Sequence, residues 1–389
     1  MTLKLAFIGT GGIAKAHLRG VAEVNQQRGA SAERLYELVA LADPRAEARE
    51  ALAVEAEATL GQRPSVYSDY HQMLDREALD VAALLVPHNL HWQIASDCLD
   101  AGLHLQVQKP IALTIAEGRR IIEYAREKER ALVVSEPSVL GRRTRAILTA
   151  LGNGSLVGTP TMLLDYAVTV LYGGFFAGTP WRHLKGMAGA GWFLDHGVHR
   201  TQWFLEALGP VAEAYALAKT FEPVRCDERH GAFTVDTEDC AMAVLRFETR
   251  VLGHWLVASA GHGARFGAVR VYGTQGVMNL DTNTVQQDRG EVQQLDTMIQ
   301  PFLDERIPAD PMAHSFAELH ALITAGSPPI SSGEQALEAL AVVYACLEAA
   351  TTGRPTMVAD VLAGAAHAYE DTIEAARPLV AEMEPGRVS

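Results

Sequence analysis

The sequence predicts an α/β protein of two domains. A doubly wound parallel sheet covered by helices comes first, and an α/β domain with an open, mostly antiparallel sheet follows. The chain has 389 residues, more than one hydrophobic core usually organises. Strand-like and helix-like segments alternate up to about residue 150, and hairpin-like strands come after them. We expect one domain at residues 1–137 and another at residues 138–389, with a late helix able to pack back on the first.

Short apolar runs bounded by turn residues mark the strands of the first domain. They are "LKLAFIG", "ELVALAD", "DVAALLVP", "LHLQVQKP" and "ALVVSEP". Between them lie Ala/Glu/Arg-rich stretches of helical length, such as "PRAEAREALAVEAEATL" and "TIAEGRRIIEYAREKER". This alternation is typical of a parallel sheet with helices on both faces.

The second domain has a different sequence pattern, in which strand-like segments follow one another. "TPTMLLDYAVTV", "DCAMAVLRFETRVLGHWLVAS", "GAVRVYGTQGVMNL" and "NTVQQD" have strand lengths and hairpin-like turns. They indicate an antiparallel sheet that is open on one face. Two Ala/Leu-rich helices are expected late in the chain, near residues 312–325 and 333–352.

Composition narrows the class of partner. The formal charge of −14 disfavours nucleic acid, because a phosphate backbone selects basic surfaces. No apolar run is long enough to span a bilayer, and the N-terminus lacks a signal-like pattern, so we expect a cytoplasmic protein without a membrane partner. The four cysteines are scattered, which favours buried reduced thiols over a metal or disulfide site. They are Cys98, Cys226, Cys240 and Cys346.

A glycine-rich turn lies between the first strand and the first helix, in "AFIGTGGIAKAH". Gly9 lets the chain turn sharply out of the strand, and Gly11 lets the backbone approach a pyrophosphate without a Cβ in the way. Ala14 permits close packing of helix on strand, and the helix N-terminus supplies amides for phosphates. A plain turn is the alternative, but the strand–turn–helix context favours a Rossmann dinucleotide site.

The second strand ends in Asp43, where a carboxylate can accept hydrogen bonds from an adenosine ribose diol. The gap from Gly9 is longer than usual, and we attribute it to an insertion in "NQQRGASAERLYE". Arg45 could instead meet the 2′-phosphate of NADP. Because Asp43 would repel that phosphate, NAD is favoured and NADP is the alternative.

Two further loops, "VPHNLHW" and "VQKPIALT", follow strand-like runs at the edge where doubly wound sheets bind ligands. Pro110 restricts Lys109 to an extended backbone, which directs its side chain. A lysine in a partly desolvated cleft can share a proton with a substrate hydroxyl. An exposed surface lysine is the alternative.

The stretch "WFLDHGVHR" holds an Asp, two His and an Arg. On a helix, Asp195 and His199 share a face, whereas His196 points elsewhere. A carboxylate and an imidazole on one face can divide substrate orientation and proton abstraction between them. Zinc is disfavoured because a third ligand is missing at a recognisable spacing, and an ordinary helix with polar capping residues is the other alternative.

Taken in order, "GTGGIA", "PHNLH", "QKP", "WRHLKGMAGAG" and "WFLDHGVH" resemble the motifs of the glucose–fructose oxidoreductase / inositol dehydrogenase (Gfo/Idh/MocA) family. "RFETRVLGHW", "VYGTQGVMNL" and "SSGEQALEALAVVYACLEAATTGRP" are similar to the second domain and returning helix of that family. The resemblance covers nearly the whole chain. It implies a Rossmann domain and an α/β domain whose open sheet forms oligomers, dimers or tetramers.

The resemblance also implies roles. Lys109 matches the lysine that positions substrate and assists proton transfer, Asp195 the acid that holds substrate, and His199 the proton acceptor. His91 matches the histidine of the loop near the nicotinamide. The implied cofactor-binding set is Gly9, Thr10, Gly11, Gly12, Ile13, Asp43, Arg45, Pro87, His88, His91, Gln108 and Lys109. The implied substrate-binding set is Glu136, Trp181, Arg182, Asp195 and His199.

Four positions depart from the family pattern. Gln108 replaces the usual Glu and removes a charge beside the nicotinamide ribose. Ala190 replaces the middle glycine of a triplet, and Gln202 stands where an Asp often follows the histidine. Glu136 could add a carboxylate to the pocket. The acid–base pair is intact, so these changes bear on substrate preference.

The leading hypothesis is an NAD(P)-dependent dehydrogenase that oxidises a secondary hydroxyl of a sugar, inositol or related polyol. Relatives that oxidise cis-dihydrodiols from aromatic breakdown give a second possibility. An NAD-assisted glycoside lyase or hydrolase, which oxidises its substrate transiently, gives a third. A nucleotide-sensing binding protein is the non-enzymatic alternative, and the presence of both Lys109 and His199 argues against it.

Overall fold

The structure is a computed structural model that describes residues 1–27, 33–170, 179–227 and 231–381. The chain forms two units, and each takes more than one stretch of sequence. The first unit contains residues 1–112, 116–144 and 304–337. The second contains residues 113–115, 145–303 and the chain from residue 338 onward. Residues 304–337 thus rejoin the unit formed by the start of the chain.

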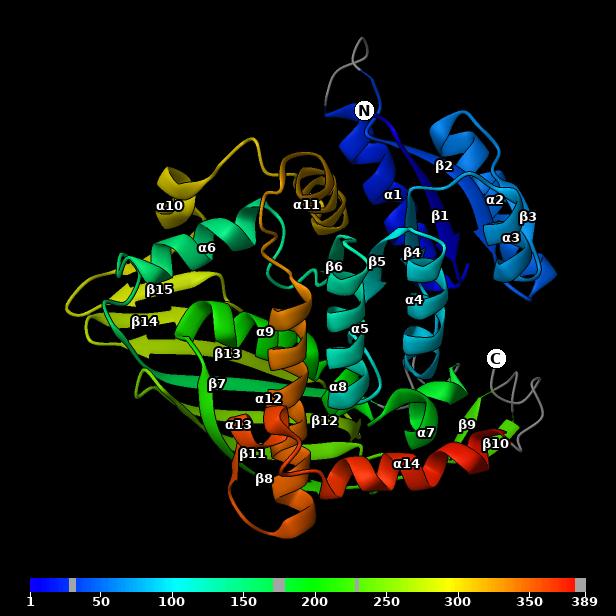
Figure 1. The fold of residues 1–389 in the computed structure, drawn as a ribbon. Helices are drawn as coiled ribbons and strands as arrows, with labels where there is room; N and C mark the ends of the chain where they lie inside the picture. Colours follow the sequence, from blue (N-terminus) through cyan, green and yellow to red (C-terminus); the bar gives the residue numbers. More distant parts are fainter. Residues whose placement is uncertain (28–32, 171–178, 228–230, 382–389) are drawn as a thin grey trace. The chain divides into compact units, whose positions relative to one another are not determined.

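The first unit contains a six-stranded parallel sheet in the order β3-β2-β1-β4-β5-β6 (Figure 1). This is the doubly wound order of dinucleotide-binding sheets, so the predicted Rossmann fold is confirmed. The sequence did not single out the short strand β3, which extends the sheet beyond β2. The strands are β1 (Leu3–Ile8), β2 (Tyr36–Ala42), β3 (Ser65–Tyr67), β4 (Val81–Leu84), β5 (His104–Gln108) and β6 (Leu132–Ser135).

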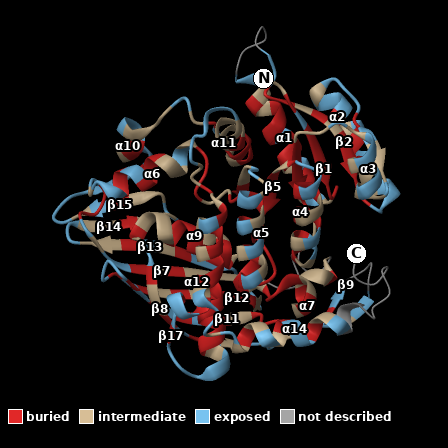
Figure 2. Ribbon diagram, in the orientation of Figure 1, coloured by how far each residue is buried: buried red, intermediate tan, exposed pale blue. Residues whose placement is uncertain are grey.

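Helices of this unit connect and cover the strands. They are α1 (Gly12–Gln26), α2 (Ala46–Leu60), α3 (Tyr70–Arg76), η1 (His88–Leu90), α4 (His91–Asp100), α5 (Ile115–Glu127) and α11 (Pro311–Ala325). The central strand β4 is wholly buried, as expected for a parallel sheet with both faces covered, whereas much of α2 and α3 is exposed (Figure 2).

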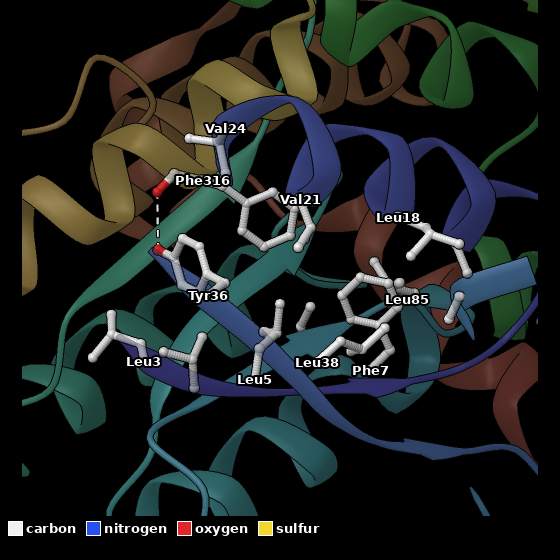
Figure 3. Close-up of a cluster of buried hydrophobic side chains, with 14 of the residues drawn as sticks. Leu3, Leu5, Phe7, Leu18, Val21, Val24, Tyr36, Leu38, Leu85 and Phe316 are labelled. Atoms are coloured by element: carbon white, nitrogen blue, oxygen red, sulfur yellow. Dashed lines mark hydrogen bonds between the residues drawn. The ribbon is translucent and has the colours of Figure 1, made fainter. Parts of the chain in front are cut away.

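Helix α11 packs against α1 and completes the core of the first unit. Its Phe316 is fully buried and lies beside Phe7 of β1, with ring centroids 6.5 Å apart. The Tyr36 hydroxyl donates a 2.9 Å hydrogen bond to the Phe316 carbonyl oxygen, which satisfies two polar groups inside an apolar cluster (Figure 3). A helix whose Phe316 lies 280 residues after Tyr36 of β2 therefore completes this core.

The second unit contains a nine-stranded sheet in the order β16-β15-β14-β13-β7-β12-β11-β8-β17. Strands β7 and β12 pair in parallel, and every other described pair in this sheet is antiparallel. The predicted mostly antiparallel sheet is therefore confirmed. The strands are β7 (Pro160–Val170), β8 (Val211–Lys219), β11 (Cys240–Phe247), β12 (Leu252–Gly261), β13 (Phe266–Gly273), β14 (Gly276–Asn279), β15 (Thr284–Gln287), β16 (Val292–Gln294) and β17 (Thr356–Met357). A separate hairpin pairs β9 (Val224–Asp227) with β10 (Gly231–Thr234).

Several helices belong to or enter the second unit. They are α6 (Arg142–Gly152), η3 (Pro180–His183), α7 (Lys185–Ala188), α8 (Trp192–Asp195), α9 (Gly197–Leu208), α10 (Leu295–Ile299), η4 (Gln300–Phe302), α12 (Gly333–Thr352), α13 (Val358–Ala363) and α14 (Ala368–Ala381). The late helices expected near 312–325 and 333–352 correspond to α11 and α12. Pro311 at the start of α11 follows Asp310, whose carboxylate accepts from the next two free backbone amides and caps the helix.

The sheet of the second unit has one buried face and one exposed face. Burial alternates residue by residue along β11, so that Ala243 and Leu245 are buried while Met242 and Val244 are exposed. The buried face holds Trp255 of β12, which is fully buried and lies 4.2 Å from the Phe193 ring, centroid to centroid. This packing sets α8 and α9 on the sheet.

Candidate functional site

Five predicted site positions follow the carboxyl ends of five neighbouring parallel strands. Gly9 follows β1, Asp43 follows β2, Pro87 comes after β4, Lys109 follows β5 and Glu136 follows β6. The carboxyl ends of parallel strands share one edge of the sheet, which is where doubly wound sheets bind ligands. The fold of the first unit therefore gathers residues that the sequence separates by more than a hundred positions.

The glycine turn has the geometry that a phosphate site needs. Gly9 has a φ of +95°, and a Cβ there would lie 2.3 Å from the Leu85 carbonyl oxygen. Gly11 caps α1 without any side-chain hydrogen bond, and a Cβ there would meet only the Arg45 guanidinium at 3.7 Å. The buried Thr10 hydroxyl oxygen lacks a hydrogen-bond partner among the described residues. Open backbone amides, a close backbone approach and an unpaired hydroxyl fit a dinucleotide diphosphate.

Asp43 is held firmly in place. Its carboxylate accepts from the backbone amide of Thr10 at 2.8 Å and from that of Arg45 at 2.9 Å. The Arg45 guanidinium donates to both carboxylate oxygens, at 3.1 and 3.0 Å. Burial by itself would raise the pKa of Asp43, but the hydrogen bonds from Arg45 and the backbone outweigh it and lower the pKa. The carboxylate is therefore ionised and faces the glycine turn.

The loop after β4 is braced from inside. His91 is fully buried, with Nδ1 3.2 Å from the Ile111 carbonyl oxygen and Nε2 3.1 Å from the Val86 carbonyl oxygen. Burial lowers the pKa of His91, against the effect of these carbonyls. Its ring ties the loop after β4 to the turn after β5. His88, in η1, is also buried, with its ring 5.9 Å from that of His91.

The end of β5 is fixed by its own side chain. The Lys109 backbone amide donates to the Gln108 Oε1 at 2.7 Å, and Gln108 is almost fully buried. Glu136, after β6, is buried as well, and its Oε1 accepts from the Ser138 amide at 2.9 Å. These two positions supply an amide and a carboxylate at adjacent strand ends.

In the second unit, the structure brings together three of the predicted substrate residues. The Arg182 Nη1 donates to the Asp195 Oδ1 at 2.8 Å, and both side chains are largely buried. The Arg182 guanidinium also lies over the Trp181 ring, 4.6 Å from its centroid. A paired carboxylate and guanidinium beside an indole face can recognise a ligand rich in hydroxyl groups.

The histidines of "WFLDHGVHR" differ in setting. Helix α8 ends at Asp195 and α9 begins at Gly197, with His196 between them in right-handed helical conformation. The His196 ring stacks on Trp192, with centroids 5.0 Å apart. His199 follows in the first turn of α9 and is partly exposed. The two histidines therefore have distinct surroundings. Of the predicted catalytic residues, Lys109 belongs to the first unit, and Asp195 and His199 belong to the second.

Sequence reasoning missed a buried carboxylate behind this stretch. The Glu238 Oε1 accepts from the Gly191 amide at 2.8 Å, at the start of the helix that carries Asp195. A Cβ on Gly191 would lie 2.0 Å from the Glu238 carbonyl oxygen, and the Tyr369 hydroxyl donates to the Gly189 carbonyl oxygen at 3.1 Å. Burial raises the pKa of Glu238 to about 7. In the sequence, only the position of Glu238 just before the strand-like run "DCAMAVLRF" could have signalled it.

Metal sites, membrane spans and disulfides were the other features to consider among the described residues. The described residues contain no group of three or more His, Cys, Asp and Glu side chains arranged to hold a metal ion. No helix within the described ranges combines the length and apolar character of a membrane span. The four cysteines are free, with Cys98 and Cys346 buried and Cys240 partly exposed. Cys226 is exposed on the hairpin strand β9, so the expectation of burial is wrong there.

The doubly wound sheet and its glycine turn define a dinucleotide-binding α/β protein with a second, sheet-based unit. Comparison of the sequence with protein families gives two matches. Residues 3–136 match the oxidoreductase family with an NAD-binding Rossmann fold, and residues 165–279 match the GFO/IDH/MocA C-terminal domain. The chain belongs to the GFO/IDH/MocA family of oxidoreductases.

Curated relatives are distant in sequence. The levoglucosan dehydrogenase of Pseudarthrobacter phenanthrenivorans is 26% identical over 253 residues, which are 59% of this chain and 62% of that protein. The chain thus spans less than two thirds of that relative's length. The myo-inositol 2-dehydrogenase of Thermotoga maritima is 26% identical over 309 residues, covering 76% of this chain and 85% of that protein.

Solved structures share the fold. A levoglucosan dehydrogenase in complex with NADH and levoglucosan matches with a TM-score of 0.75 at 20% identity, covering 92% of this chain and 100% of that chain. An NAD-binding oxidoreductase from Klebsiella pneumoniae matches with a TM-score of 0.75 at 20% identity, covering 92% and 99%. At these identities the likeness establishes the fold.

Proposed function

We propose that this protein is an NAD-dependent dehydrogenase that oxidises a secondary hydroxyl of a sugar, an inositol or a related polyol. The observation that carries the proposal is the largely buried Arg182–Asp195 pair, joined at 2.8 Å at the end of α8, with His199 in the first turn of the next helix, α9. A hydroxyl-rich ligand can both donate to this carboxylate and accept from this guanidinium, which an apolar ligand cannot do. The dehydrogenases of levoglucosan and myo-inositol among the relatives support the same substrate class.

Each part of the chain has a proposed task. The amides of the glycine turn and the start of α1 hold the diphosphate, and Asp43 accepts from the adenosine ribose hydroxyls. Arg45 now donates to both carboxylate oxygens of Asp43. Its guanidinium must therefore release one of these oxygens when the ribose binds. When bound, the nicotinamide supplies the hydride acceptor. NAD is preferred to NADP because the ionised Asp43 disfavours a 2′-phosphate.

The reacting hydroxyl needs a proton acceptor. His199 takes that proton, and Lys109 donates a hydrogen bond to the same oxygen and steadies the charge that develops on it. Asp195 accepts a hydrogen bond from a second hydroxyl of the substrate, next to the reacting one. Its pairing with Arg182 keeps the carboxylate oriented. Trp181 offers an indole face to the ring carbons of the substrate.

The first experiment is a screen of the purified protein against levoglucosan, myo-inositol, D-glucosides and cis-dihydrodiols, each with NAD and with NADP. Reduced nicotinamide is followed by its absorbance. Stoichiometric reduction with a sugar or polyol supports the proposal. Reduction with dihydrodiols alone, or none with any substrate, rejects it.

A second candidate is a glycoside-cleaving enzyme that uses NAD catalytically. A 96-residue stretch is 28% identical to the alpha-N-acetylgalactosaminidase of Shewanella oneidensis, covering 24% of this chain and 21% of that protein. In the same screen, release of an aglycone without accumulation of NADH would favour this candidate over the dehydrogenase.

A further inference from the structure

A buried row of hydrogen bonds runs through the first unit to the backbone of Lys109. His17, in the second turn of α1, lies between two side chains of β5: its Nδ1 is 3.2 Å from the Gln106 Oε1, and its Nε2 is 3.1 Å from the Gln108 Nε2. The Gln106 Nε2 donates to the Ser315 hydroxyl at 2.8 Å, and the Gln108 Oε1 accepts from the Lys109 amide at 2.7 Å. His17, Gln106 and Ser315 are fully buried.

One backbone group fixes the direction of every bond in this row. The Lys109 amide can only donate, so the atom that faces it is the oxygen of Gln108. The Gln108 amide nitrogen then faces His17 and must donate, so Nε2 of His17 is an acceptor. A neutral ring that accepts at Nε2 carries its hydrogen on Nδ1 and donates to the Gln106 oxygen.

The surroundings keep His17 neutral. Its ring meets Phe7 and Phe316 edge-on, with centroids 6.3 and 5.8 Å away. Burial lowers the pKa of His17 to about 4, against the smaller effect of Gln106. A neutral donor–acceptor ring is the species that satisfies both glutamines, since a charged ring would leave Gln108 with a donor facing a donor.

We propose that His17 is a positioning residue: it holds the Gln108 side chain in one orientation and thereby fixes the backbone from which the Lys109 side chain projects. The residue lies on a different element from Lys109 and acts only through Gln108. The inference rests on the proposed function only in assigning Lys109 a part in the dehydrogenase reaction. The hydrogen-bond row itself is independent of the substrate.

The first test needs no substrate. Nitrogen-15 NMR of histidine-labelled protein reports the protonation of each ring nitrogen, and the signal lost in His17→Gln identifies His17 among the 14 histidines. We expect an unprotonated Nε2 and a protonated Nδ1 throughout the neutral pH range. A protonated Nε2, in the neutral or the charged ring, would overturn the proposal.

The second test reads the position of Lys109 directly. The rate of trace acetylation of Lys109, relative to the exposed Lys4, is measured by mass spectrometry in wild type, His17→Leu, His17→Gln and Val21→Ala. His17→Leu removes both bonds and should change the Lys109 rate by about threefold or more. His17→Gln retains one donor and one acceptor and should restore the rate. Val21→Ala, also fully buried on α1 but outside the row, controls for lost packing and should leave the rate unchanged.

The outcomes separate the two proposals. An unchanged Lys109 rate in His17→Leu, or an equal change in Val21→Ala, overturns the positioning role. If none of the sugars and polyols tested supports reduction of NAD, the proposed function is rejected. The NMR and acetylation results still decide the present inference in that case. With an active substrate, His17→Leu should lower kcat by about 10- to 100-fold and leave KM for NAD nearly unchanged.

Discussion

Arg45 holds both carboxylate oxygens of Asp43, with its Nε 3.1 Å from Oδ1 and its Nη2 3.0 Å from Oδ2. The arginine side chain is 43% exposed and the aspartate side chain 5%, so the cation can move away while the anion stays in place. An adenosine ribose would need the acceptor sites that Arg45 now fills, whereas a 2′-phosphate would need Arg45 itself. We therefore propose that this pair decides the choice between NAD and NADP.

The first prediction follows from that relationship. Asp43→Ala should weaken binding of NAD by about tenfold or more and should weaken NADP less, because it removes the diol acceptor and releases Arg45. Dissociation constants for both cofactors, from nucleotide fluorescence, check this. Arg45→Ala is the matched variant and should spare NAD. Equal loss of both cofactors in Asp43→Ala would contradict the ribose assignment.

Two glycines of one turn should respond differently to an added methyl group. Gly9→Ala should destabilise the fold by about 2 kcal/mol or more, because φ is +95° and the Cβ would lie 2.3 Å from the Leu85 carbonyl oxygen. Gly11→Ala, with a φ of −68° and only Arg45 nearby, should leave stability within about 0.5 kcal/mol.

The same Gly11→Ala variant should bind NAD about tenfold more weakly, since the methyl group occupies the approach of the diphosphate. Urea denaturation and nucleotide titration of both variants make the comparison. Normal NAD affinity in Gly11→Ala would place the diphosphate elsewhere.

The acid–base assignment separates two neighbouring histidines. His199→Ala should lower turnover by about 10²- to 10⁴-fold, the usual effect of losing one positioned proton acceptor. NAD affinity should hold, because the predicted nucleotide site lies in the first unit. His196→Ala, which loses a stack on Trp192, should be far milder. Steady-state kinetics and nucleotide titration of both variants, with and without a chelator, test this. Equal losses, or inactivation by EDTA that zinc reverses, would refute it.

Glu238 should make stability depend on pH. Because its pKa in the folded chain is about 7 and its ordinary value is 4.5, the folded state binds more protons than the unfolded state between these values. The free energy of unfolding should therefore fall as pH rises through this interval, by at most about 3 kcal/mol. Glu238→Gln, which can still accept from Gly191, should be more stable than wild type at pH ~8 and should lose that advantage at pH ~5.

Urea unfolding of wild type and Glu238→Gln at the two pH values measures this difference. The exposed Glu291→Gln serves as the control and should track wild type at both. An advantage for Glu238→Gln that is the same at both pH values would mean that Glu238 does not titrate in this range.

The open face of the second sheet should bind a second copy of this chain. Leu217 of β8 and Met242 of β11 are cross-strand partners, 65% and 47% exposed, in a face with further exposed apolar side chains. Such a surface is a liability in a monomer. We expect light scattering at micromolar concentration to give a dimer or tetramer, and the double variant Leu217→Lys, Met242→Lys to be a monomer. Val54→Lys, on α2 in the first unit, should remain oligomeric. A monomeric wild type would reject the prediction.

Local sequence determined a large part of this fold. Five strands of the parallel sheet, the glycine turn and helices α11 and α12 lie where periodicity and turn residues placed them. Their signals are short-range: an apolar run, a small residue at a sharp turn, an Ala/Leu-rich stretch of helical length. The order of the family motifs added the roles proposed for Lys109, Asp195 and His199, which composition and spacing leave open.

Tertiary structure decided which distant groups meet. The pairing of Arg182 with Asp195, of Gly191 with Glu238 and of His17 with Gln108 joins residues that lie 13, 47 and 91 positions apart. Nothing in a local pattern specifies such contacts, because a buried polar group is satisfied by whichever partner the packing of helices and strands brings within hydrogen-bond distance. The sequence thus determined most of the elements and the edge of the sheet at which we predict that ligands bind. Burial in the folded chain, which no local pattern specifies, raises the pKa of Glu238 and lowers the pKa of His17.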